Sequence, residues 1–202
     1  GLNALKSENP DLKLLLSIGG WGSGNFSEAA ASDAARATFA ESAARLVTQH
    51  WLDGIDIDWE YPTLPGPGIS HSPADRGNFT RLLQAVRDRL DALGKADGRH
   101  YLLTIAAAYG EAARGLDVPR IVPLLDWINL MTYDFFGSLT VTTGHHAALG
   151  TSASAPADAR TTVAVASAPV RVCCAACSTA VAVALALTRV CSTICACIVA
   201  VA

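Results

Sequence analysis

The sequence predicts an α/β fold built on a parallel sheet. Short and almost continuous apolar runs are typical of strands that are buried on both faces. Longer segments with apolar residues three and four positions apart, as on one face of a helix, lie between these runs. Strand, helix and strand in alternation at this spacing indicate a parallel sheet, either open and covered by helices or closed into a barrel.

Four apolar runs are expected to form strands, and two longer segments are expected to form helices. The strands cover Leu12–Gly20, Gly54–Trp59, Tyr101–Ala108 and Trp127–Tyr133. The helices cover Ser32–Gln49 and Ala74–Leu93. Because the runs are apolar along nearly their whole length, we expect them to lie inside the protein.

The starts of both expected helices carry residues suited to capping. Ser32 or Asp33 can cap the first helix, because a short polar side chain accepts a hydrogen bond from the free amides of the first turn. Ser72, followed by Pro73 at the first helical position, can open the second helix.

Length and charge limit the classes of protein to consider. The 202 residues are enough for one domain with a sizeable core. The formal net charge of −3 and the lack of a Lys/Arg cluster argue against a nucleic-acid partner. The chain begins at Gly1 and shows no targeting segment, so we expect a piece of a longer protein or a processed product.

The composition changes near Gly150 and divides the chain into residues 1–150 and 151–202. The second part holds all six cysteines and is otherwise mostly Ala, Val, Thr and Ser. A zinc site is disfavoured because this tail has no His and its cysteine spacing fits no usual ligand pattern. A membrane segment is disfavoured because Arg189 interrupts the apolar run. We expect a tail that is not native to the fold, for example one read in a shifted frame.

The expected strand at Gly54–Trp59 is unusual because acidic and apolar side chains alternate along it. Successive side chains of a strand point to opposite faces, so Asp56, Asp58 and Glu60 share one face. Burial and mutual repulsion raise the pKa of at least one of three neighbouring carboxylates. Glu60 lies at the carboxyl end of the strand, where parallel α/β folds build their active sites. The pattern favours catalysis by an acid that stays protonated near neutral pH.

A solvated acidic strand and a cation site are the alternatives to catalysis. A cation site usually takes oxygens from a flexible loop, and a rigid strand with Ile55, Ile57 and Trp59 suits it poorly. His145 and His146 invite a metal-site interpretation, but no third ligand is visible in the sequence near them. We therefore expect no metal and no cofactor.

Three short motifs resemble the signature segments of a known family. They are "SIGGW" at Ser17–Trp21, "DGIDIDWEYP" at Asp53–Pro62 and "MTYD" at Met131–Asp134. In order and spacing they resemble glycoside hydrolase family 18, the chitinase family, over about residues 10–150. The resemblance implies a (β/α)8 TIM barrel, of which the four expected strands would be strands 3 to 6. Since such a barrel needs about 250 residues, we expect only part of it here, inactive or poorly folded by itself.

The resemblance also implies a mechanism in which the carbonyl oxygen of the substrate's own N-acetyl group attacks the anomeric carbon. Glu60 would be the general acid and then the general base. Asp58 would hold the acetamido N–H and stabilise the oxazolinium ion, with Asp56 behind it sharing a proton or a hydrogen bond. Tyr133 would donate its hydroxyl to the acetamido oxygen.

Other residues of these motifs are expected to contact the substrate. Met131 and Asp134 would line the same pocket as Tyr133. Trp21 follows a Gly pair at a strand end, where an exposed indole can stack on a sugar ring, although core packing would explain it as well. Alternation assigns Trp59 to the core, while Tyr61 can reach the cleft if the strand end bends.

The remaining motif residues are expected to be structural. Ser17, Gly19 and Gly20 are small and permit close packing beneath the site. Asp53 is out of register with the other acids, so we expect it to stabilise the start of its strand.

By resemblance, the expected function is hydrolysis of β-1,4-N-acetylglucosamine linkages in chitin with retention of configuration. An endo-β-N-acetylglucosaminidase acting on N-glycans shares the acidic strand and is the enzymatic alternative. A non-catalytic chitin-binding lectin is another, although such proteins commonly lose the terminal acid, which is Glu60 here. The expected partners are chitin or N-acetylglucosamine oligosaccharides, with no nucleic acid and no membrane. The expected form is an extracellular monomer.

Overall fold

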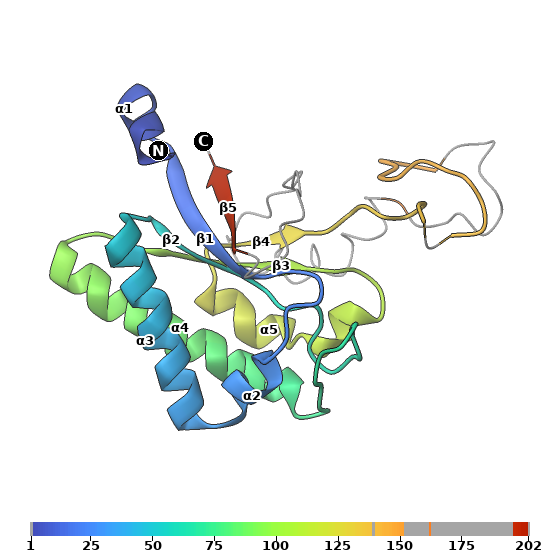
Figure 1. The fold of residues 1–202 in the computed structure, drawn as a ribbon, viewed down its shortest axis with the longest axis horizontal. Helices are drawn as coiled ribbons and strands as arrows, with labels where there is room; N and C mark the ends of the chain where they lie inside the picture. Colours follow the sequence, from blue (N-terminus) through green and yellow to red (C-terminus); the bar gives the residue numbers. More distant parts are fainter. Residues whose placement is uncertain (1, 139, 152–161, 163–195, 202) are drawn as a thin grey trace.

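The computed structural model describes residues 2–138, 140–151, 162 and 196–201. Its centre is a five-stranded sheet in the order β4-β3-β2-β1-β5, in which β1 to β4 run parallel (Figure 1). The strands are β1 Lys13–Gly19, β2 Gly54–Asp58, β3 Leu102–Ala107, β4 Trp127–Leu130 and β5 Ala196–Val201. The first four lie inside the four predicted runs, so the predicted strands and their parallel arrangement are confirmed.

Strand β5 lies at the edge of the sheet beside β1 and runs antiparallel to it, with Lys13 opposite Val201. It therefore does not continue the parallel order of the other four strands. Most of the predicted tail, at 152–161 and 163–195, lies outside the described residues. The division of the chain near residue 150 and the origin of the tail stay predictions.

Helices cover one face of the sheet, with α3 and α4 side by side beneath it (Figure 1). The longer helices are α2 Phe26–Ala31, α3 Asp33–His50 and α4 Asp75–Asp97. The shorter turns are η1 Leu2–Ala4, α1 Leu5–Glu8, η2 Ala112–Gly115, α5 Val118–Ile121 and η3 Val122–Leu124. Both predicted helices are present, whereas the short ones had too few residues to show a helical period. No helix in the described part of the chain is long and apolar enough to cross a membrane.

The capping predictions were right for one helix and inexact for the other. The Ser32 side chain caps α3 and accepts a hydrogen bond from the backbone N–H of Ala35 at 3.2 Å. Helix α4 begins at Asp75, two positions after Pro73. The Asp75 carboxylate accepts a hydrogen bond from the backbone N–H of Ser72 at 2.6 Å, which holds the preceding residues in a turn outside the helix.

The core lies between the sheet and its helices and takes the apolar side chains of β2. Ile55 and Ile57 are fully buried, and Trp59 is 3% exposed. The Trp59 ring stacks on Phe26 with centroids 5.4 Å apart and meets Phe79 edge-on at 5.3 Å. Trp59 therefore belongs to the core, as alternation predicted.

Asp53 lies at the amino end of β2 and joins the start of the sheet to two cations. Its carboxylate accepts a hydrogen bond from the backbone N–H of Leu14 at 2.8 Å and forms ion pairs with Lys6 and Arg99, each at 2.5 Å. The structure thus places Asp53 at the opposite end of the strand from Glu60.

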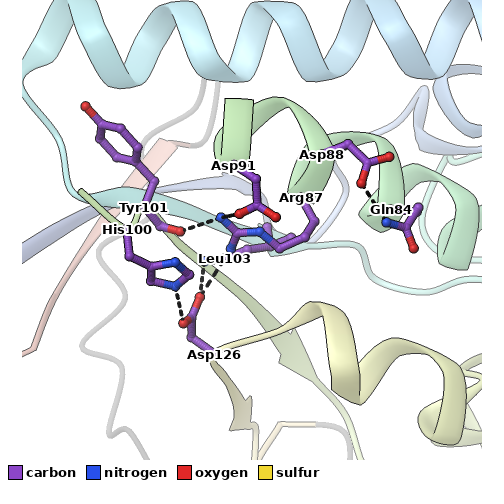
Figure 2. A network of polar contacts seen from close by, with 8 residues as sticks. All are labelled: Gln84, Arg87, Asp88, Asp91, His100, Tyr101, Leu103 and Asp126. Carbon is purple, nitrogen blue, oxygen red and sulfur yellow. Dashed lines mark hydrogen bonds and ion pairs between the residues drawn. The ribbon is translucent and has the colours of Figure 1, made fainter. Parts of the chain in front are cut away.

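A second carboxylate, Asp126, has the same position before β4 (Figure 2). It contacts His100 Nε2 at 2.6 Å and accepts a hydrogen bond from the backbone N–H of Leu103 at 2.8 Å. Arg87 of α4 lies 3.5 Å from Asp126 and donates to the carbonyl oxygen of Tyr101 at 2.8 Å. Asp53 and Asp126 tie strand starts together, so the polar groups at this end of the sheet serve stability.

Candidate active site

The acidic side chains of β2 lie on the sheet face opposite to α3 and α4. Asp56 is 2% exposed and Glu60 is 9% exposed. Asp58, between them, is also largely removed from water. The structure therefore brings the three predicted acids to one face, with Glu60 at the carboxyl end.

Asp56 is held by donors from three other strands, β1, β3 and β4. Its Oδ2 accepts a hydrogen bond from the Ser17 hydroxyl at 2.7 Å. Its Oδ1 accepts one from the Thr104 hydroxyl at 2.5 Å and one from Asn129 Nδ2 at 3.1 Å. These three hydrogen bonds fix the orientation of the Asp56 carboxyl group behind the site.

Asp58 has a different environment from Asp56. Its Oδ1 is buried and has no hydrogen-bond partner among the described residues. Burial raises the pKa of Asp58 from 3.8 to about 7, and the charges of Glu60 and Asp56 add to the effect. Asp58 therefore holds a proton at mildly acidic pH and has an oxygen free for a ligand.

Glu60 is the outermost acid and is paired with a phenol. Burial raises the pKa of Glu60, a hydrogen bond from Tyr61 opposes this, and the charge of Asp134 adds to the rise. Burial, followed by the charge of Glu60, likewise raises the pKa of Tyr61, which therefore stays a donor. Glu60 has the properties of a general acid that is protonated above the usual range of a glutamate.

Tyr133 lies within the electrostatic influence of the same acids. Burial raises the pKa of Tyr133 to about 12, and the charges of Asp58, Glu60 and Asp134 contribute in that order. At neutral pH its hydroxyl keeps the proton and can donate a hydrogen bond to a substrate oxygen. Three negative charges acting on one phenol show that β2 and the segment after β4 converge here.

His146 covers the outer side of Tyr133. The two rings are stacked with centroids 6.0 Å apart and an interplanar angle of 15°. His146 Nδ1 also lies 3.4 Å from Asp134 Oδ1, and both side chains are exposed. No three His, Cys, Asp or Glu side chains meet as a metal site would require in the part of the chain that the structure describes.

An exposed aromatic pair adjoins the acids. Trp21 is 61% exposed and meets the half-buried ring of Tyr61 edge-on, with centroids 6.2 Å apart. Tyr61 also forms a hydrogen bond with Glu60 and so joins the Trp21 indole to the outermost acid. Met131, partly buried, precedes the Tyr133–Asp134 pair. The four predicted substrate contacts thus follow the carboxyl ends of three strands, Trp21 after β1, Tyr61 after β2, and Met131 and Asp134 after β4.

The small residues of the first motif have two different roles. Ser17 bonds directly to Asp56, so it is more than a spacer. A Cβ on Gly19 would lie 2.0 Å from the backbone oxygen of Asp58, and its φ of +127° suits only glycine. Gly20 has a φ of +102° and donates its backbone N–H to the same oxygen at 2.8 Å. Glycine at these positions lets β1 approach β2 beneath the acids.

Thr104 and Asn129 are site residues that the sequence reasoning missed. Thr104 is fully buried in the otherwise apolar β3, and Asn129 is 9% exposed in the short apolar β4. A lone polar residue in a buried strand needs a partner, and this was the signal that could have identified them.

Comparisons with known proteins agree on one family. The sequence model of Glycosyl hydrolases family 18 matches residues 1–177. Chitinase A1 of Niallia circulans is 45% identical over 159 residues, which are 77% of this chain and 23% of that protein.

Solved structures agree with this result. A family 18 N-acetylglucosaminidase from Paenibacillus barengoltzii superposes with a TM-score of 0.79 at 46% identity, over 85% of this chain and 50% of that one. ChiW of a Paenibacillus species, a multi-modular chitinase expressed on the cell surface, superposes with a TM-score of 0.72 at 42% identity. The match covers 76% of this chain and 18% of that one. The chain therefore spans half or less of the length of these relatives, and its four parallel strands are part of a larger (β/α)8 barrel.

Proposed function

The chain belongs to glycosyl hydrolases family 18, and from this we propose that it carries the catalytic acids of an enzyme that hydrolyses β-1,4-N-acetylglucosamine linkages in chitin. The observation that carries the proposal is the graded environment of three acids on one strand. Asp56 has three donors, the pKa of Asp58 is raised to about 7, and Glu60 stands outermost with a raised pKa. Pairs of acids whose environments separate their pKa values are typical of acid–base sites.

Glu60 would act first as the general acid. The carbonyl oxygen of the substrate's N-acetyl group forms a bond to the anomeric carbon, the bond to the glycosidic oxygen breaks, and that oxygen takes the proton of Glu60. Water then attacks the anomeric carbon of the oxazolinium ion and gives a proton to Glu60, while the bond from that carbon to the acetamido oxygen breaks and restores the N-acetyl group. Two displacements on the same carbon restore the original configuration.

Asp58 and Tyr133 would hold the attacking group. An oxygen of Asp58 accepts the acetamido N–H, and its carboxyl stabilises the positive oxazolinium ion. The Tyr133 hydroxyl donates to the acetamido oxygen, which orients it toward the anomeric carbon. The raised pKa of Tyr133, about 12, supports this role because the phenol remains a donor.

Substrate binding would use the aromatic pair and the segment after β4. Trp21 offers an exposed indole face next to Tyr61, as stacking on a sugar ring requires. Met131 and Asp134 would line the pocket around the acetamido group. The curated relative from Niallia circulans is a chitinase by name, so an endo-β-N-acetylglucosaminidase acting on N-glycans is not favoured.

The origin and location of the protein are part of the proposal. We expect an extracellular monomer, and a cell-surface-expressed relative supports the location. The family match continues to residue 177, past the change in composition near residue 150. Resequencing the coding DNA tests the proposed frame shift, which an intact reading frame through codon 202 would exclude.

The function is tested in the full-length protein that contains these residues. We expect it to release the aglycone from an aryl chitotrioside, and Glu60→Gln to lower kcat by about 100-fold or more. Glu41→Gln, the same substitution on the exposed face of α3, should leave kcat unchanged. Nuclear magnetic resonance of the first product should show the β anomer. An inverted product, or full activity of Glu60→Gln, would contradict the proposal.

A further inference from the structure

The chain that follows β4 leaves the sheet and comes back to the candidate active site at His146. The backbone N–H of Phe135 donates to the carbonyl oxygen of His146 at 3.0 Å, which joins the two ends of this segment. Phe135 is 7% exposed, and its ring meets that of Tyr109 edge-on with centroids 5.1 Å apart. One end of the segment is therefore anchored in the fold, and His146 is tied to that end.

Contacts within this return loop, residues 135–138 and 140–146, hold its shape. The Thr140 hydroxyl accepts a hydrogen bond from the backbone N–H of Gly137 at 3.1 Å, and the backbone N–H of Thr140 donates to the carbonyl oxygen of Gly137 at 3.1 Å. A Cβ on Gly144 would collide with the ring of Phe136, so glycine lets the two arms of the loop pack together. Compact loops whose ends meet are frequent carriers of functional residues.

The return loop places the His146 side chain against two residues of the third motif. The imidazole is stacked on the ring of Tyr133, with centroids 6.0 Å apart and an interplanar angle of 15°. Its Nδ1 lies 3.4 Å from Oδ1 of Asp134. His146 is thus held through its backbone, its ring and one nitrogen, although it is exposed. Ordering an exposed side chain costs conformational entropy, so these contacts need an explanation.

The partly buried phenol of Tyr133 is the group beside His146 that needs a fixed position. Among the ring contacts found in the described part of the chain, the stack with His146 is the one that involves Tyr133. Its hydroxyl has no hydrogen-bond partner within the same described residues. The direction of this donor is therefore set by how the ring is packed. In a reacting complex, a misplacement of about 1 Å can cost about 100-fold in rate.

The contact with Asp134 by itself explains His146 less well than the stack does. The two side chains are 61% and 73% exposed, and a charge pair so exposed contributes little to stability. Stacking of the two rings does not depend on charge, and it acts on the partly buried phenol. We therefore assign the main effect to the ring of His146, while Asp134 sets the rotation of the imidazole.

We infer that His146 is a positioning residue, whose stacked imidazole holds the Tyr133 ring so that the phenol hydroxyl meets the acetamido oxygen of the substrate. The inference rests on the proposed function, in which this hydroxyl aligns the acetamido oxygen for attack on the anomeric carbon. His146 acts through Tyr133 and does not touch the reacting atoms. Loss of the stack should therefore lower kcat more than it changes KM, because the substrate still binds but its oxygen is less well aligned.

The first test measures kcat and KM on an aryl chitotrioside with the full-length protein. His146→Ala should lower kcat by about three- to tenfold, as for the loss of one aromatic pair, with KM changed by less than about twofold. His146→Phe keeps a flat ring without the nitrogen and should retain most of kcat. His146→Asn keeps a polar side chain without the ring and should behave as His146→Ala. His50→Ala is the matched control, because His50 is exposed at the end of α3 and lies toward the amino end of β2.

The second test asks whether His146 acts through the Tyr133 hydroxyl. In a Tyr133→Phe background this hydroxyl is absent, so His146→Ala should cause no further loss of kcat. A residue that acts by itself, or that only stabilises the loop, would lower kcat by the same factor in both backgrounds. Equal losses in the two backgrounds would therefore overturn the inference.

The outcomes separate this inference from the function on which it rests. A wild-type protein without turnover overturns both. An active wild type whose His146→Ala variant keeps its kcat overturns the inference and leaves the function standing, and so does an active wild type in which His146→Asn, rather than His146→Phe, retains kcat. If His146→Ala does not fold, as a thermal melt would show, equal values of kcat in His146→Phe and His146→Asn are enough to overturn it.

Discussion

The buried carboxyl of Asp58 should lower the stability of the protein at neutral and alkaline pH, and Asp58→Asn should remove this penalty. Burial is the main cause of its raised pKa, with the charges of Glu60 and Asp56 adding to it. One of its oxygens also lacks a hydrogen-bond partner among the described residues. An amide is neutral at every pH and avoids the cost of burying a charge.

The sign of the effect follows from proton binding. An acid whose pKa is higher in the folded than in the unfolded state binds more protons when folded, so the free energy of unfolding falls as pH rises. For Asp58 the fall begins near 3.8 and is complete by about pH 7. At about 1.4 kcal/mol per pKa unit, the penalty above that pH is about 4 kcal/mol.

The assay is urea unfolding of the full-length protein at about pH 4 and about pH 8. Between these conditions, the gain in free energy of unfolding from Asp58→Asn should increase by about 3 to 4 kcal/mol. Comparing the variant with the wild type at each pH cancels the titration of distant groups. Asp11→Asn, an exposed acid-to-amide change, is the control and should show no such difference.

An equal effect of Asp58→Asn at both pH values would refute the reasoning. It would mean that Asp58 ionises as easily in the folded protein as in the unfolded chain. In the proposed mechanism the variant also loses activity while it gains stability, since its amide offers only one acceptor and no titratable proton.

Three further predictions concern single residues. Asp53→Asn should lower the free energy of unfolding by about 1–3 kcal/mol at pH 7. Burial opposes the ionisation of Asp53, but Lys6, the Leu14 amide and Arg99 together lower its pKa. Urea titrations should therefore show that the loss fades as pH falls through and below 3.8. Tyr133→Phe should lower kcat by about 10- to 100-fold with little change in KM, and an unchanged kcat would exclude a hydrogen bond to the reacting group. Gly19→Ala should lower Tm by several degrees or prevent folding, because its Cβ would lie 2.0 Å from the oxygen of Asp58; a normal melt would show that β1 and β2 can separate.

Much of the fold was predictable because the responsible signals are local. Apolar runs and helical spacing identified four strands and two helices to within a few residues. Alternation separated Asp56, Asp58 and Glu60 from the core residue Trp59, since a strand has only two faces. The predicted start of α4 was slightly too early. The hydrogen bond from the backbone N–H of Ser72 to the Asp75 carboxylate holds Ser72 to Ala74 in a turn before the helix, and the sequence pattern did not reveal this turn.

The partners of the acids were not predictable, because they come from distant parts of the chain. Thr104 and Asn129 are 48 and 73 positions from Asp56. Asn129 on β4 reaches Asp56 on β2 across the intervening strand β3. This contact depends on how the three strands are aligned with one another, which cannot be read from any one segment of the sequence. The contact of His146 with Tyr133 likewise depends on the return of a loop.

The sequence by itself determined that three acids would face one side of a buried strand and that Glu60 would stand at its carboxyl end. Both facts follow from the two-residue period of a strand and the direction of the chain. Only the tertiary structure decided how these acids differ. Donors from three other strands hold Asp56, and none of them reaches the buried Oδ1 of Asp58, because strand order and register set which side chains meet.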